Sequence, residues 1–190
     1  RLCEASEVSI RINPDTGAGH HDHCITGGKE SKFGIFESDI PKAIEIMKQY
    51  KLRLIGVHSH IGSGILDVDK YMEVMEIILS IAKKFEGLEF IEFGGGFGIA
   101  YSPEESDFDL QSCGKRVGER MEEFAREYGS RPVMAIEPGR FLVAESGIFL
   151  TTVVDIKDTP KYHFVGVDSG FNHLIRPMAY GSYHHVLNAS

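Results

Sequence analysis

The chain has 190 residues, of which 42% are hydrophobic, and it carries a formal net charge of −8. This composition predicts a globular protein of one domain or slightly more, and the acidic balance without a basic tract argues against nucleic acid or an anionic membrane as a partner. Three cysteines without CxxC spacing, no apolar run of membrane-spanning length and no visible signal peptide predict a cytoplasmic protein.

Predicted strands and helices alternate from the start of the chain. The run Val8–Ile12 alternates apolar and polar residues and is closed by an Asn-Pro-Asp turn, which predicts a strand. A polar loop rich in glycine and histidine follows at Gly17–Gly28. Ser38 is then expected to cap a helix whose apolar residues recur at helical spacing over 40–47. A second strand is predicted at Leu52–His58.

The alternation continues through two further strands. Asp67 or Asp69 is expected to cap a helix with apolar residues along one face over 71–82. The remaining elements predicted here are a strand at Leu88–Phe93, a helix over 117–128 and a short buried strand at Val133–Glu137.

Short apolar strands that alternate with helices predict an α/β domain with a parallel sheet covered by helices. The pattern changes after the fourth strand, because residues 147–156 and 162–167 are strand-like with no helix between them. We therefore expect a domain boundary within 141–146. An α/β domain over 1–146 would be followed by an antiparallel β domain that begins at 147 and continues to 190.

Unusual polar motifs follow each predicted strand. Arg11 lies at the end of the first strand, His58–Gly64 follows the second, Gly94–Gly98 the third and Glu137–Arg140 the fourth. The carboxyl ends of parallel strands meet at one edge of the sheet, where barrel and open α/β enzymes place their chemistry. The sequence therefore predicts a functional face at this edge.

The motifs suggest recognition of a phosphorylated aromatic ligand. Gly94–Gly96 offers backbone amides that an anion can approach, and the Ser63 hydroxyl can bond phosphate. The imidazole of His60 can lie against a planar ring, and Arg140 adds a cation near a phosphate or carboxylate. An ionised Glu137 beside a pyridine nitrogen would hold that nitrogen protonated. The alternative for each motif is structural: a plain turn, a hydrogen-bonded histidine or a local ion pair.

Five runs of the sequence resemble one family: RINPD…TGGKESKFGI, HSHIGSG, EFGGGFGIAY, EPGR and VDSGFNHLIRPMAYGSYHH. They resemble the fold-type III pyridoxal-phosphate-dependent decarboxylases, in the branch that acts on diaminopimelate. The resemblance runs nearly end to end. It implies the last four strands of an alanine racemase-like (β/α)8 TIM-type barrel, followed by the start of a C-terminal β domain. It also implies a homodimer with shared active sites that decarboxylates meso-2,6-diaminopimelate to L-lysine, with pyridoxal 5'-phosphate as cofactor.

The resemblance gives roles to individual residues. Glu137, paired with the pyridine nitrogen, and His60, stacked on the cofactor ring, are the expected catalytic residues. Arg140 would lie between phosphate and substrate, and Arg176 and Tyr180 would bind the distal carboxylate of the substrate. The phosphate is expected on Ser63, Gly96 and Gly139 in a turn shaped by Gly94 and Gly95, with Arg11 as a further cofactor-binding candidate.

The sequence lacks several family features. The lysine that binds the cofactor covalently would precede Arg1, and none of Lys29, Lys32, Lys42 or Lys51 has a matching context. A cysteine–glutamate segment and a late tyrosine would follow Ser190, and Cys113, placed in a loop before a helix, does not replace them. We therefore expect a central fragment that is inactive alone.

Three other interpretations remain open. A metal-dependent hydrolase could use His20, His21, His23 and Cys24 with His58 and His60, but the loop spacing is too tight for a regular tetrahedral site and no metal is predicted. The chain could belong to a non-catalytic paralogue, because the deciding lysine is missing. It could also act on another basic amino acid or a polyamine precursor.

Overall fold

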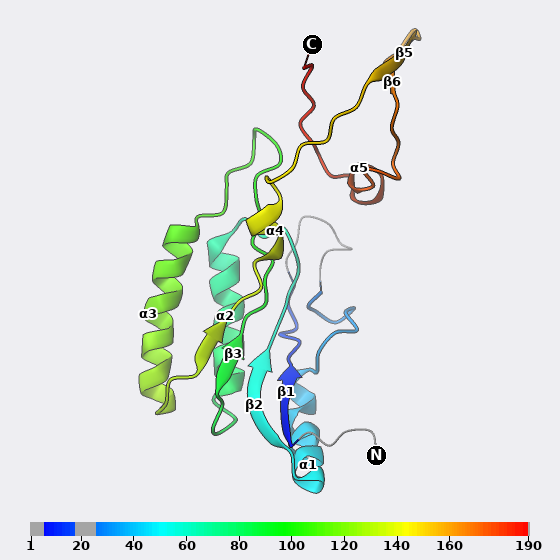
Figure 1. Cartoon of the computed structure of the whole chain (residues 1–190). Helices are drawn as coiled ribbons and strands as arrows, with labels where there is room; N and C mark the ends of the chain where they lie inside the picture. Colours follow the sequence, from blue (N-terminus) through cyan, green and yellow to red (C-terminus); the bar gives the residue numbers. More distant parts are fainter. Residues whose placement is uncertain (1–5, 18–25, 190) are drawn as a thin grey trace. The chain divides into compact units, whose positions relative to one another are not determined.

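The structure is a computed structural model that describes residues 6–17 and 26–189 (Figure 1). The described chain forms two compact units, one of residues 1–100 with 106–142 and one of residues 101–105 with 143–190. The glycine- and histidine-rich loop falls mostly outside the described residues, including His20, His21, His23 and Cys24 of the metal interpretation.

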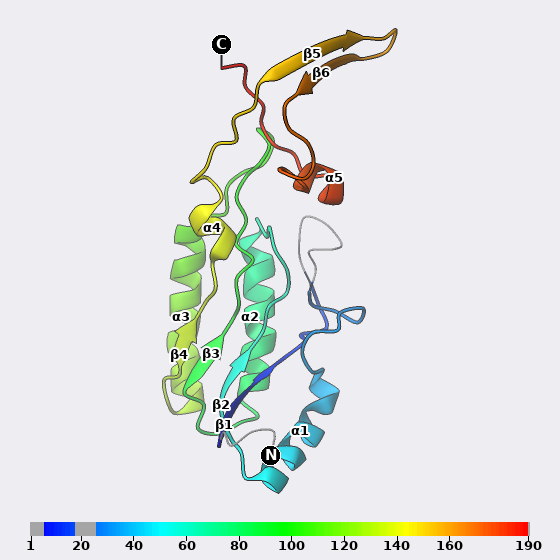
Figure 2. The same cartoon turned by 45° about the vertical axis from the view of Figure 1, so that its right-hand side comes forward.

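A four-stranded parallel sheet organises the larger unit. Its strands are β1 (Glu7–Arg11), β2 (Arg53–His58), β3 (Phe90–Glu92) and β4 (Val133–Ala135), and they lie side by side in chain order. The predicted α/β alternation and the parallel sheet are confirmed. Figures 1 and 2 show the three long helices behind one face of the sheet, as right-handed crossovers between adjacent parallel strands require.

The helices are α1 (Ile40–Tyr50), α2 (Val68–Ala82) and α3 (Leu110–Tyr128), with a short 3₁₀ turn, η2 (Glu37–Asp39), before α1. The predicted cap of α2 is confirmed, because the Asp67 side chain accepts a hydrogen bond from the Asp69 backbone N–H at 2.8 Å. The predicted apolar face of α2 is also buried.

Two local predictions are wrong. Ser38 does not cap α1, because it lies inside η2 and the N-cap position falls on Asp39, which makes no side-chain capping bond. Cys113 is not in a loop. The Asp109 side chain accepts from the Ser112 N–H at 2.8 Å, so α3 begins at Leu110 and Cys113 is buried in its first turns.

The core of the larger unit lies between the sheet and the helices. Val57 of β2 and Ile91 of β3 are fully buried on the helix-facing side, and Ile78 of α2 and Phe124 of α3 are buried against that side. Side chains alternate across a strand, so the neighbours of Val57 and Ile91 point to the opposite face of the sheet.

Strand β4 differs from its prediction as a buried strand. Val133 is 67% exposed, Ile136 is 43% exposed, and the strand ends at Ala135 rather than at Glu137. Among the described strands only β3 pairs with β4, so one side of β4 has no neighbour to cover it. The apolar sequence indicates which side chains of β4 could be buried, but their burial also requires a neighbouring element that covers them.

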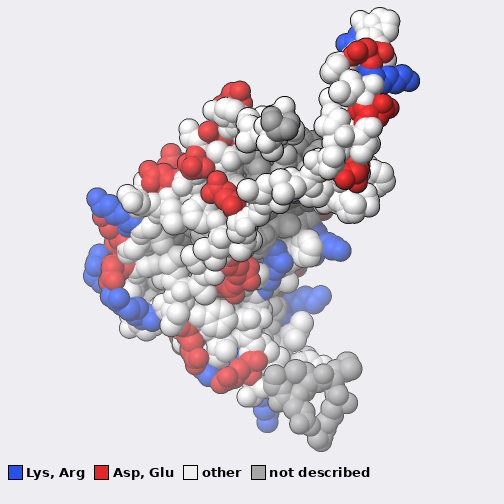
Figure 3. Space-filling model, turned by 45° about the horizontal axis from the view of Figure 1, so that its top comes forward, with Lys and Arg blue, Asp and Glu red and all other residues white. Residues whose placement is uncertain are grey.

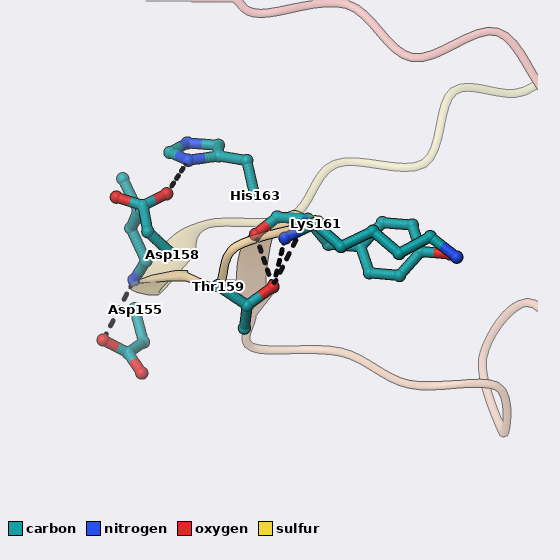
Figure 4. Close-up of polar contacts among 7 residues, drawn as sticks. Asp155, Asp158, Thr159, Lys161 and His163 are labelled. Carbon is teal, nitrogen blue, oxygen red and sulfur yellow. Dashed lines mark hydrogen bonds and ion pairs between the residues drawn. The ribbon is translucent and has the colours of Figure 1, made fainter.

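The smaller unit contains an antiparallel pair, β5 (Val153–Asp158) and β6 (His163–Val167), and a short helix, α5 (Arg176–Tyr180). The predicted switch to antiparallel strands is confirmed, although the first strand begins at Val153 rather than at Gly147. The hairpin turn is closed by Thr159, whose hydroxyl accepts from the Tyr162 N–H at 2.9 Å (Figure 4). His163 pairs with Asp158 beside this turn.

Another short helix, α4 (Gly139–Val143), follows the Glu137-Pro138 turn and was not predicted. No described helix is both long and apolar enough to cross a membrane. Acidic and basic side chains are interspersed over the face shown in Figure 3. Surface ion pairs join α2 and α3, including Arg116–Asp69 and Arg120–Glu76, each at 2.6 Å.

Candidate active site

Four residues form a row across the carboxyl end of the sheet. Arg11 pairs in register with His58, His58 with Glu92, and Glu92 with Ala135. Paired residues of parallel strands point to the same face, which here is the face opposite the helices. The pairing of the strands alone therefore places the Arg11 cation, the His58 imidazole and the Glu92 carboxyl group side by side, without any contribution from the loops.

His60 is fixed just beyond this row. Its carbonyl accepts from Arg11 Nη2 at 3.2 Å and from Thr26 Oγ1 at 2.9 Å. The Gly95 backbone N–H donates to His60 Nδ1 at 3.1 Å, which places the proton of the neutral ring on Nε2. Burial lowers the pKa of His60, the Arg11 cation lowers it further, and the Glu137 carboxylate partly opposes this. The ring is therefore held neutral and in one tautomer.

The glycine turn after β3 fits closely against the turns after β2 and β4. A Cβ on Gly95 would lie 2.0 Å from the Glu137 carbonyl oxygen, and one on Gly96, whose φ is +96°, would lie 2.5 Å from the Gly62 oxygen. The Gly94 carbonyl accepts from the Glu137 N–H at 2.7 Å, and the Gly96 carbonyl accepts from Ile65 at 2.8 Å. Only glycines allow the three turns to meet in this way.

Glu137 faces a histidine and a second acid. His58 Nε2 lies 3.7 Å from Glu137 Oε2, too far for a hydrogen bond, and this nitrogen is buried without a hydrogen-bond partner in the described chain. Burial lowers the pKa of His58, and the Glu137 carboxylate opposes the shift. Burial raises the pKa of Glu92, and the negative charge of the nearby Glu137 raises it further.

The structure brings most of the predicted cofactor residues together. Arg11, His60, Gly95, Gly96 and Glu137 are joined by the contacts above. Gly139 and Arg140 begin α4, directly after this cluster, and the Gly139 N–H donates to the Glu137 carbonyl at 2.8 Å.

Ser63 follows β2, in the turn whose Gly62 oxygen lies against Gly96. The predicted substrate residues Arg176 and Tyr180 lie at the two ends of α5, in the smaller unit. The roles predicted for all these residues stay predictions.

Within the smaller unit, Arg176 has its own set of contacts. The guanidinium lies over the Tyr101 ring, 4.3 Å from its centroid, and Nη1 lies 3.1 Å from His184 Nε2. Arg176 Nη2 is buried and has no hydrogen-bond partner among the described residues. Burial lowers the pKa of His184, and the adjacent cation lowers it further, so the ring accepts from the guanidinium as a neutral imidazole.

Two members of the cluster were not assigned to it from the sequence. Glu92 was treated as part of an apolar strand, and His58 was given an individual role only in the metal interpretation. The available signal was an acidic residue between Ile91 and Phe93, because an unpaired charge is unfavourable in a buried strand. That signal identifies an unusual residue, but it does not identify its partner.

Two hollows of the described surface lie away from this cluster. One of about 520 Å³ is lined by residues that include Asn13, Phe36 and Ile81, and one of about 390 Å³ by residues that include Pro41 and Lys84. Neither contains the strand-end residues. The Asn13 side chain in the first hollow already makes four hydrogen bonds within the chain, which favours a structural role.

Comparison with protein families gives a match over residues 1–144, to the family described as pyridoxal-dependent decarboxylase, pyridoxal binding domain. Among curated proteins, the diaminopimelate decarboxylase of Methanothermobacter thermautotrophicus is 44% identical over 98% of this chain and 45% of its own length. The Escherichia coli K12 protein of the same name is 38% identical over 94% of this chain and 43% of its own length.

A solved structure shows the same likeness. The crystal structure of diaminopimelate decarboxylase from Helicobacter pylori, complexed with L-lysine, matches with a TM-score of 0.85 at 33% identity. The match covers 98% of this chain and 47% of that chain. The chain therefore spans less than half the length of the relatives that it matches.

Proposed function

The chain belongs to the pyridoxal-dependent decarboxylase family, and from this we propose that it is a segment of an enzyme that decarboxylates meso-2,6-diaminopimelate to L-lysine and CO2. One observation carries the proposal: the turns after β2, β3 and β4 meet so that neutral His60, the glycine turn and the Glu137 carboxylate form one cluster. The names of the relatives support the choice of substrate.

The residues present fit pyridoxal phosphate. A carboxylate suits a protonated pyridine nitrogen, which assigns Glu137 to that end of the ring, and neutral His60 offers a flat face for stacking. Ser63, Gly96 and Gly139 with Arg140 and Arg11 would serve the phosphate. Because the Gly95 N–H already donates to His60, Gly95 shapes the turn. When bound, the cofactor supplies an electron sink for the negative charge left as CO2 departs.

The chain's own residues would hold and orient the reactants. Glu137 would keep a negative charge beside the ring nitrogen, and His60, held neutral by burial and Arg11, would not compete for that charge. Arg140 would lie between phosphate and substrate. Arg176, with an unsatisfied Nη2, and Tyr180 would take the distal carboxylate that distinguishes diaminopimelate from a diamino monoacid.

We further propose how the segment fits its parent. Residues 1–146 would supply the last four strands of a (β/α)8 barrel, and 147–190 would begin the C-terminal β domain. The parent would be a cytoplasmic homodimer with shared active sites. The lysine that binds the cofactor covalently would come from outside these residues, so this chain alone would be inactive.

The test uses the full-length enzyme and measures lysine released from meso-diaminopimelate. We expect activity that depends on pyridoxal phosphate, and a Glu137→Ala variant with kcat lower by at least about 100-fold, the scale on which a single electrostatic contact to a transition state acts. Glu86→Ala, an exposed acid away from the cluster, is the matched control.

The substrate is tested with Arg176→Ala in the same enzyme. Loss of the guanidinium should raise KM for diaminopimelate strongly, because the distal carboxylate loses its partner. An unchanged KM would point to another basic amino acid or a polyamine precursor as substrate. A full-length protein that binds the cofactor but releases no lysine would favour the non-catalytic paralogue.

A further inference from the structure

We propose that Glu92 is a positioning residue for Glu137: a protonated Glu92 carboxyl donates a hydrogen bond to the Glu137 carboxylate, so that the pair carries a single negative charge of fixed orientation. The proposal rests on the proposed function, because it concerns the acid that would face the cofactor ring. Neither family likeness nor sequence motif assigned a role to Glu92.

The geometry comes from the ends of three neighbouring strands. His58 ends β2, Glu92 ends β3, and Glu137 follows β4, and one side-chain nitrogen or oxygen from each lies within 4.8 Å of the others. His58 and Glu92 are register partners, and the backbone N–H of Glu137 is tied to Gly94, two residues beyond Glu92. The two carboxyl groups are therefore brought together by rigid backbone pairing.

The charges around the pair favour one shared proton. Two ionised carboxylates in contact repel each other, and a hydrogen bond from a protonated acid to an ionised one removes that repulsion. The other titratable groups at these strand ends are His58, which ends β2, and His60, just beyond β2, both held neutral by burial. Arg11, which ends β1, binds the His60 carbonyl. None of these donates a hydrogen bond to Glu92 in the described chain.

The division of the proton within the pair follows from position. Glu92 ends a strand inside the sheet, where burial raises its pKa, whereas the Glu137 side chain is more exposed. Glu92 is therefore the protonated partner, and Glu137 keeps its charge and is held in place by the hydrogen bond from Glu92.

The first measurement uses the 190-residue chain without cofactor. Carbon-13 NMR of the Glu92 carboxyl group as a function of pH should show a pKa above the ordinary value of 4.5, and Glu137→Gln should bring it down by removing the neighbouring charge. A Glu92 that titrates at or below the ordinary value would overturn the proposal.

The second measurement uses substitutions in the full-length enzyme. Glu92→Gln keeps a neutral hydrogen-bond donor of the same shape, so kcat should stay within about threefold of wild type. Glu92→Ala removes the donor, so kcat should fall by about tenfold, the loss of one hydrogen bond to a charged group, with KM little changed. Equal losses in both variants would mean that Glu92 acts as an ionised acid and would refute the pairing.

The two measurements separate this inference from the proposed function. If the enzyme does not act on diaminopimelate, the NMR titration still reports on the carboxyl pair. A third arm adds Zn²⁺ to the chelator-treated chain. Saturable binding that is lost in Glu92→Gln would show that the three side chains receive a cation in place of the shared proton, and it would overturn the proposal.

Discussion

At the scale of single residues, His60 shows how backbone contacts set the chemistry of a side chain. The Gly95 N–H requires an unprotonated Nδ1, and burial with Arg11 lowers the pKa of the ring. Protonation would therefore break a hydrogen bond and place a second positive charge beside Arg11. A histidine constrained in this way stays neutral at neutral pH.

This predicts how stability depends on pH. Because the folded pKa of His60 lies below the ordinary 6.5, the unfolded state binds more protons just below pH 6.5. The contribution of His60 to the free energy of unfolding is fully present above pH 6.5 and is lost as pH falls through the folded pKa. Urea unfolding of the larger unit should thus show wild type losing more stability between pH 7.5 and 5.5 than His60→Gln.

Wild type and His60→Gln are compared at the same pH, so that the titration of Glu92 affects both proteins. The raised pKa of Glu92 acts with the opposite sign: its contribution to stability is lost as pH rises from 4.5 through the folded pKa. His185→Gln, an exposed histidine of the smaller unit, is the control and should leave the pH dependence of the larger unit unchanged. Parallel losses in wild type and His60→Gln would contradict the neutral state of His60.

At the scale of elements, the glycine turn after β3 is the point on which three neighbouring turns depend. Gly95→Ala would drive a methyl group into the Glu137 carbonyl, which lies 2.0 Å from the Cβ position. We expect a loss of about 1–3 kcal/mol in unfolding free energy, the usual cost of overpacking. Thermal and urea denaturation followed by circular dichroism measure it.

Gly118 provides the matched control for this substitution. It lies in α3 with open space at its Cβ position, so Gly118→Ala should stabilise the chain by about 0.5–1 kcal/mol through helix propensity. Equal effects of the two substitutions on the free energy of unfolding would show that the backbone of the turn can shift to accept a methyl group. The close approach of Gly95 to Glu137 would then not require a glycine.

An element can be predicted from the sequence when the interactions that form it lie between residues close together in the chain. The apolar face of α2 and the Asp67 cap are local patterns, and both predictions are confirmed. The exposure of Val133 was not predictable, because it depends on whether another strand lies beside β4. Glu92 was missed for a related reason: its role depends on Glu137, a residue distant in sequence whose side chain comes within 4.8 Å only once the strands are paired.

At the scale of the molecule, the two units differ in how they are held together. The fully buried apolar residues of the described chain all lie in the larger unit, whereas every residue of β5 is exposed. A two-stranded hairpin without a packed face is marginally stable. The smaller unit is therefore ordered by local turns and hydrogen bonds such as those of Thr159 rather than by a core.

Hydrogen exchange measures this difference. Amides of β5 and β6 should exchange far faster than those of α2, because opening the hairpin exposes little additional apolar surface. Mass spectrometry of peptides from 153–167 and 68–82, taken from the same sample, gives the comparison with its internal control. Equally slow exchange in both peptides would show that a partner surface covers the hairpin.

The hairpin also has a practical consequence for the behaviour of the chain in solution. Its two outer backbone edges lack neighbouring strands in the described chain, and the side chains of Val154, Ile156 and Val165 face water. Such edges act as templates for strands of other molecules. Concentrated samples should accumulate intermolecular β-structure that starts at this hairpin, and a lysine introduced at Ile156 should slow the growth of light scattering during storage.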